Sequence, residues 1–153
     1  MNKSYHTLCK AFQGTRRLSL IHQLVERYNW HTIAAEEAVT KYVMFLSLAA
    51  EEISKREPIP LVPTATIDRV WETDILKNTI EYMELCKSLC GEVIHHANEG
   101  ELKRMRGFKN IETAFSLTQT LFIQHFGENI GGGNIAGHHS AQIAACGVLI
   151  KAS

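Results

Sequence analysis

The chain has 153 residues, of which 45% are hydrophobic and 21% charged, and its 16 basic residues balance its 16 acidic ones. This length and composition predict one globular domain with a hydrophobic core. The zero formal net charge argues against binding to nucleic acid or to an anionic membrane surface. No apolar stretch reaches the roughly 18 residues that a membrane-spanning helix needs. Because the first residues also lack the apolar core of a secretory signal, we expect a cytoplasmic protein with reduced cysteines.

Two amphipathic helices are predicted in the first third of the chain. Between residues 17 and 28, large apolar side chains recur every three or four positions, which is the period of a helix. A second helix is predicted over residues 32–55. Glu36 and Glu37 lie near its start and Lys55 at its end, as the helix dipole favours.

A proline-rich connector is predicted next, because all three prolines of the chain fall within residues 57–63. Proline lacks an amide donor and pushes the residue before it towards extended geometry. Thr64 or Thr66 can then cap a short helix that includes residues 67–75.

Two further helices are predicted to end at glycines. One covers residues 78–90 and ends at Gly91; the other covers residues 110–125 and ends at Gly127. The polar stretch between them, residues 97–109, is predicted to be a loop. The predicted fold class is therefore all-α, a single small domain of about five helices with an extended proline-rich connector.

The last part of the chain has a different composition, since six of the ten glycines fall between Gly127 and Gly147. Glycine loses the most backbone entropy on folding, so such a segment favours flexibility. We therefore predict a helical module over residues 1–126 and a flexible glycine-rich tail over residues 127–153. Within the tail, residues 140–149 are predicted to form one short helix.

An ordered series of motifs covers residues 30–96. It comprises Tyr42, Phe45 and Leu46; Val62, Pro63 and Thr64; Ile67, Asp68 and Trp71; Ile75 and Leu76; Thr79, Tyr82 and Cys86; and Gly91, Ile94, His95 and His96. In this order the motifs resemble those of the glycine-rich domain-containing protein-like family. The later Phe-Gly pair at residues 126–127 and the glycine-rich end also resemble such proteins. The resemblance implies a small helical binding or interaction module.

The chain departs from the family's pattern directly after the tryptophan. Where the family has His-x-His, this chain has Glu72 and Asp74. Asp74 together with His95 and His96 predicts a site for a divalent metal such as iron(II) or manganese, with Cys86 as a further candidate ligand. Glu72 is the weaker candidate, because residues two apart on a helix do not share a face.

The same residues also have a structural interpretation, a core of hydrogen-bonded histidines and carboxylates. Trp71 is then a core anchor whose indole N–H needs an acceptor, and Asp68 lies near a helix start where its charge is favourable. Cys86 and Cys90, one helical turn apart, are then small buried residues.

No standard catalytic signature occurs in the sequence: there is no nucleophile elbow, no phosphate-binding glycine loop and no His-Glu-x-x-His. We therefore expect a non-enzymatic binding module for a protein or peptide partner. One alternative is a metal-dependent protein or enzyme that uses Asp74, His95 and His96. A second alternative is that residues 127–153 form a peptide that is processed, modified or offered to a partner.

Overall fold

The computed structural model describes residues 3–104, 108–131 and 149–150, and helices make up most of them. The helices are α1 (Lys3–Ala11), α2 (Thr15–Tyr28), α3 (Thr32–Ile53), α4 (Ala65–Lys77), α5 (Thr79–Cys90), α6 (Glu99–Leu102) and α7 (Ile111–Phe126). Two strands of two residues each, β1 (His95–His96) and β2 (Leu149–Ile150), complete the described elements. The all-α fold class is confirmed, and the five predicted helices correspond to α2, α3, α4, α5 and α7. The short helices α1 and α6 are not among those predicted.

Side-chain caps explain where three of the helices begin. The side chain of Thr64 accepts a hydrogen bond from the amide of Ile67 at the start of α4. Asn78 and Asn110 cap α5 and α7 in the same way. These caps satisfy amides that have no partner within the first turn of a helix. Of the two residues proposed for the start of α4, Thr64 is therefore the cap.

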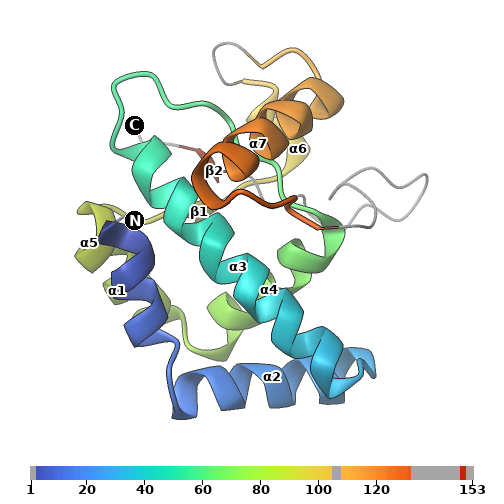
Figure 1. Cartoon of the computed structure of the whole chain (residues 1–153). Helices are drawn as coiled ribbons and strands as arrows, with labels where there is room; N and C mark the ends of the chain where they lie inside the picture. Colours follow the sequence, from blue (N-terminus) through green and yellow to red (C-terminus); the bar gives the residue numbers. More distant parts are fainter. Residues whose placement is uncertain (1–2, 105–107, 132–148, 151–153) are drawn as a thin grey trace.

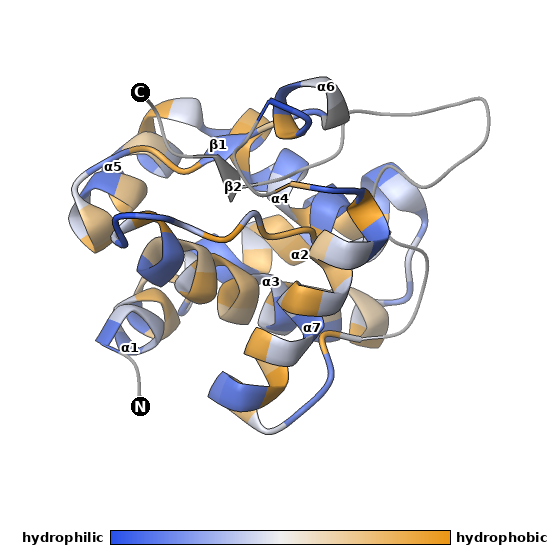
Figure 2. Cartoon of the chain, turned by 90° about the horizontal axis from the view of Figure 1, so that it is seen from above, coloured by the Kyte–Doolittle hydropathy of each residue, from blue (hydrophilic) through white to orange (hydrophobic). Residues whose placement is uncertain are grey.

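Helix α3 lies at the centre of the molecule and contacts α1, α2, α4, α5 and α7 (Figure 1). Figure 2 shows hydrophobic residues along α3 and on α7. From Val43 to Ala50 every side chain of α3 is buried. A helix that is buried all round has no solvent face, so the surrounding helices must supply the polar surface. The core around α3 therefore holds the helices in place.

The proline-rich connector packs against the helices at two points. The carboxylate of Glu52, at the end of α3, accepts a hydrogen bond from the amide of Ile59. The amide of Val62 donates to the hydroxyl of Thr118 on α7, at 2.9 Å. The connector thus links the end of α3 to the middle of α7, and it contains no helix or strand, as predicted.

The structure differs from the prediction for residues 127–153 where it describes them. Residues 127–131 continue the folded body, since Lys41 binds Glu128 and the carbonyl of Asn129, and Ile130 is buried. Leu149 belongs to a strand rather than to the end of a helix, in keeping with the strand preference of the aliphatic run at residues 148–150. The rest of the helix predicted over 140–149 lies outside the described residues.

None of the described helices is long and apolar enough to cross a membrane.

Candidate functional site

The three metal ligands predicted from the sequence do not come together. Asp74 binds Tyr42 and Arg16, His96 binds Asp68, and the side chain of His95 is exposed. Among the described residues, no group of three or more His, Cys, Asp or Glu side chains is placed to hold a metal ion. The carboxylate of Asp74 and the imidazole of His96 already have protein partners. The interpretation as a hydrogen-bonded core therefore fits these residues better than the interpretation as metal ligands.

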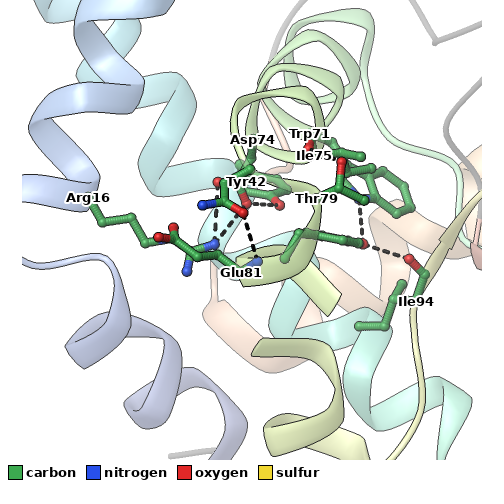
Figure 3. Close-up of polar contacts among 10 residues, drawn as sticks. Arg16, Tyr42, Trp71, Asp74, Ile75, Thr79, Glu81 and Ile94 are labelled. Atoms are coloured by element: carbon green, nitrogen blue, oxygen red, sulfur yellow. Dashed lines mark hydrogen bonds and ion pairs between the residues drawn. The ribbon is translucent and has the colours of Figure 1, made fainter. Parts of the chain in front are cut away.

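Asp74 lies in a buried polar network between α2, α3 and α4 (Figure 3). Its carboxylate accepts a hydrogen bond from the Tyr42 hydroxyl at 2.9 Å, and the Arg16 guanidinium lies 3.4 Å away. Arg16 also packs over the ring of Phe12, 4.6 Å from its centroid. Burial raises the pKa of the Asp74 carboxyl, while Arg16 and Tyr42 lower it in part.

A second network joins α4, α5 and the segment before β1. The indole N–H of Trp71 donates to the Tyr82 hydroxyl at 2.8 Å, and that hydroxyl donates to the carbonyl of Ile94 at 2.6 Å (Figure 3). Trp71 is fully buried, which confirms it as a core anchor. Burial raises the pKa of Tyr82 well above its ordinary value, so the phenol stays neutral and can donate.

The His-His motif is divided between a surface residue and a buried contact. The Nε2 atom of His96 lies 2.8 Å from a carboxylate oxygen of Asp68, and its ring meets the Trp71 ring edge-on at 4.9 Å. His95, the next residue on β1, is exposed. Asp68, predicted to act at a helix start, therefore also fixes β1 against α4.

Cys86 and Cys90 lie in the folded body, as the structural interpretation of the cysteine pair expects. Cys86 is fully buried, whereas Cys90 is half-buried and donates a hydrogen bond to the Cys86 carbonyl. Burial raises the pKa of both thiols. The thiolate is the reactive form of cysteine, so these thiols are poorly suited to nucleophilic chemistry at neutral pH.

An open pocket of about 350 Å³ lies where the turn between α2 and α3 meets the start of α4. It is lined by Asn29, Trp30, His31, Ala34, Thr66 and Arg69. The lining combines an aromatic wall, a hydroxyl and cationic or ionisable nitrogen groups. Ligand sites are usually concave and mostly apolar, whereas four of the six residues that line this pocket are polar or charged, so it suits a polar or charged ligand group.

Aromatic contacts fix the cationic side of the pocket. The rings of Tyr28 and Trp30 stack with their centroids 5.4 Å apart. The Arg69 guanidinium lies over the Tyr28 ring, 5.4 Å from its centroid. No carboxylate of the described residues pairs with Arg69, so its N–H groups are available to an anion.

The backbone beside the pocket adds to its positive character. His31, the residue before α3, makes no side-chain cap, and the first turn of α3 contains no acidic residue. The residue before Trp30, Asn29, has a left-handed backbone with φ of 53°, which turns the chain between the two helices. Because the first amides of a helix carry a partial positive charge, they reinforce the field of Arg69.

A second pocket of about 230 Å³ adjoins the first, and the two share Ala34 and Thr66. It extends along α3 to Lys41, Ile130 and Gly131. Lys41 is already bound to Glu128, so Arg69 is the stronger candidate for an anion. We call these two adjoining pockets the groove. The second pocket is also lined by Glu37, so an acidic group of a ligand belongs at the Arg69 end of the groove.

Sequence reasoning missed this groove. In the sequence, Asn29 and Trp30 register only as an interruption of the helical pattern, and Arg69 is one charge on a helix. The available signal was the pair of aromatic residues at a helix break, because a turn exposes side chains that a helix would bury. Only the packing of α2 against α4 brings Arg69 to Tyr28.

Comparison with known proteins gives no relative: no family model, no curated protein and no solved structure matches the chain.

Proposed function

We propose that the chain is a small helical binding module and that it holds an acidic peptide segment of a partner protein in the groove beside Trp30. The single observation that carries this proposal is the pocket in which Arg69 has no carboxylate partner among the described residues and lies over a stacked aromatic pair. A carboxylate on Arg69 with an apolar side chain against Trp30 would satisfy both features.

The placement of the titratable groups favours binding over catalysis. Asp74 and Tyr42 are buried and hydrogen-bonded to each other, and Tyr82 is buried and hydrogen-bonded to Trp71 and Ile94. None of these three side chains lines the groove, and the titratable side chains of His31 and Glu37, which do line it, are exposed to solvent. A catalytic acid or base must be within hydrogen-bond reach of its substrate. The proposal agrees with the resemblance to the glycine-rich domain-containing protein-like family, which implies a binding module.

A peptide library tests the proposal directly. The purified chain is applied to an array of random eight-residue peptides, and enriched peptides are measured in solution by fluorescence anisotropy. We expect the enriched sequences to carry an acidic residue close to an aromatic or aliphatic one. We expect Arg69→Ala to weaken their binding about fivefold, as for a solvent-exposed charge contact, and added salt to weaken binding by the wild-type chain.

The matched control is Arg56→Ala, which removes an exposed arginine that does not line the groove. It should bind the enriched peptides like the wild-type chain. The proposal is wrong if no acidic preference emerges, or if both arginine variants lose the same amount of affinity. Trp30→Leu provides a second variant. It removes the aromatic wall of the pocket and should weaken the binding of peptides that carry an aromatic side chain.

A further inference from the structure

Two motifs that lie far apart in the sequence meet in one short strand ladder. Strand β1, the His-His motif, pairs with β2 in antiparallel orientation, with His95 opposite Ile150 and His96 opposite Leu149. Strand β2 also contacts α3. Residues 132–148 separate β2 from Gly131, the nearest described residue before it.

Strand β1 is fixed by the folded body independently of β2. The carbonyl of Ile94 accepts a hydrogen bond from Tyr82, and the His96 ring is bound to Asp68. Ile94 and Ala97, the residues on either side of β1, are buried. The body therefore holds β1 in an extended conformation and presents its edge to any strand that can pair with it.

We infer that the edge of β1 is a binding site for an extended peptide strand and that the chain's own residues 149–150 occupy it in cis. Strand pairing recognises backbone amides and carbonyls, so it does not depend on which chain supplies the strand. The fitting partner has the chemistry of the strand that pairs there, an uncharged aliphatic segment without proline like Leu149 and Ile150.

The cis strand competes with such a partner. A strand tethered by a short connection acts at an effective concentration on the order of millimolar, so a free peptide at micromolar concentration does not displace it. The edge opens to a partner only when β2 is withdrawn. This site uses neither Trp30 nor Arg69, so the inference does not depend on the proposal of peptide binding in the groove.

Hydrogen–deuterium exchange of the full-length chain tests the site. The double variant Leu149→Pro/Ile150→Pro removes both amide donors of β2, and proline cannot pair as a central strand residue, so the carbonyls of β2 also leave the β1 amides that they protect. We expect amide exchange over residues 94–97 to accelerate about tenfold or more, as the loss of one or two backbone hydrogen bonds allows. The control Leu149→Ala/Ile150→Ala keeps the donors and should retain most of the protection.

A synthetic peptide of residues 147–153 then supplies the strand in trans. Added to the double-proline variant at about 1 mM, the concentration scale of the tethered strand, it should slow the exchange of residues 94–97 back towards the wild-type rate. It should leave the wild-type chain unchanged, and a peptide with proline at the two strand positions should have no effect.

Three results would overturn the inference. The first is unchanged exchange over residues 94–97 in the double-proline variant, which would mean that β2 does not protect β1. The second is an equal loss of protection in the alanine variant, because side chains rather than backbone pairing would then hold the segment. The third is an added strand peptide that gives no recovery, because the edge would then not accept a strand from another chain.

Discussion

The buried polar side chains of the described residues have hydrogen-bond partners within the protein. Asp74 is the clearest case, since sequence reasoning places it among metal ligands and the structure pairs it with Tyr42 and Arg16. A buried carboxylate needs partners that compensate for its lost hydration, and a phenol with a guanidinium provides them. The hydrogen bonds from Trp71 to Tyr82 and from Tyr82 to the carbonyl of Ile94 likewise give buried polar groups their partners, here between neutral groups.

Asp74→Asn should change how stability depends on pH. Burial raises the pKa of Asp74 in the folded state above its ordinary value of 3.8, so the folded chain holds this proton more tightly than the unfolded chain. Its contribution to stability is full below pH 3.8 and is lost as the pH rises through the folded-state pKa. Urea unfolding of both proteins over a pH series measures this contribution.

The free energy of unfolding of the wild-type chain minus that of Asp74→Asn should therefore decrease as the pH rises from 3.8. Asparagine still offers Tyr42 an acceptor and does not titrate, so the variant lacks this contribution. A difference that increases with pH would show that the ion pair with Arg16 outweighs burial and would contradict the prediction.

At the scale of the elements, local signals decide where helices begin and end. Asn78 and Asn110 start α5 and α7, and Gly91 and Gly127 end them in left-handed conformations. These features depend on a few neighbouring residues. The sequence predicts both glycine ends, whereas it indicates Asn78 and Asn110 only as the first residues of their helices. Helix α1 is only nine residues long, and the packing of Leu8 in the core stabilises it.

Gly127→Ala tests the end of α7. Gly127 has φ of 71°, and a Cβ atom there would meet no atom within 4 Å, so the cost is one of backbone conformation alone. We expect the free energy of unfolding to fall by about 1 kcal/mol, measured by urea denaturation. Gly127→Asn should cost less, because asparagine tolerates the left-handed region. Equal stability of the alanine variant and the wild-type chain would refute this account of the cap.

At the scale of the whole molecule, contacts between distant segments hold the helices around α3. The connector is attached to α7 through Val62 and Thr118, and the residues after α7 return to α3 through Lys41. These contacts join positions 56 and 88 residues apart in the chain. No local pattern predicts them, because each depends on how the helices pack.

Thr118→Val tests the attachment of the connector. Thr118 is fully buried, and valine has nearly the same shape, so the substitution removes the acceptor of the Val62 amide without leaving a cavity. We expect a loss of about 1–3 kcal/mol in the free energy of unfolding, the cost of a buried unsatisfied donor.

The matched control is Thr120→Val on the same helix, where the exposed hydroxyl donates to the Ser116 carbonyl of its own helix. It should change stability by less than about 0.5 kcal/mol. Similar losses in the two variants would indicate a general effect of valine on α7 rather than the loss of the Val62 contact.

The sequence by itself determined the all-α class, the five main helices, the glycines that end α5 and α7 and the extended connector, because helical periodicity, glycine and proline act over a few neighbouring positions. Only the tertiary structure decided the partners of Asp74 and His96, the groove beside Trp30 and the pairing of β1 with β2. Each of these joins segments that are separated in the chain, and hydrophobic packing around α3 determines which side chains meet.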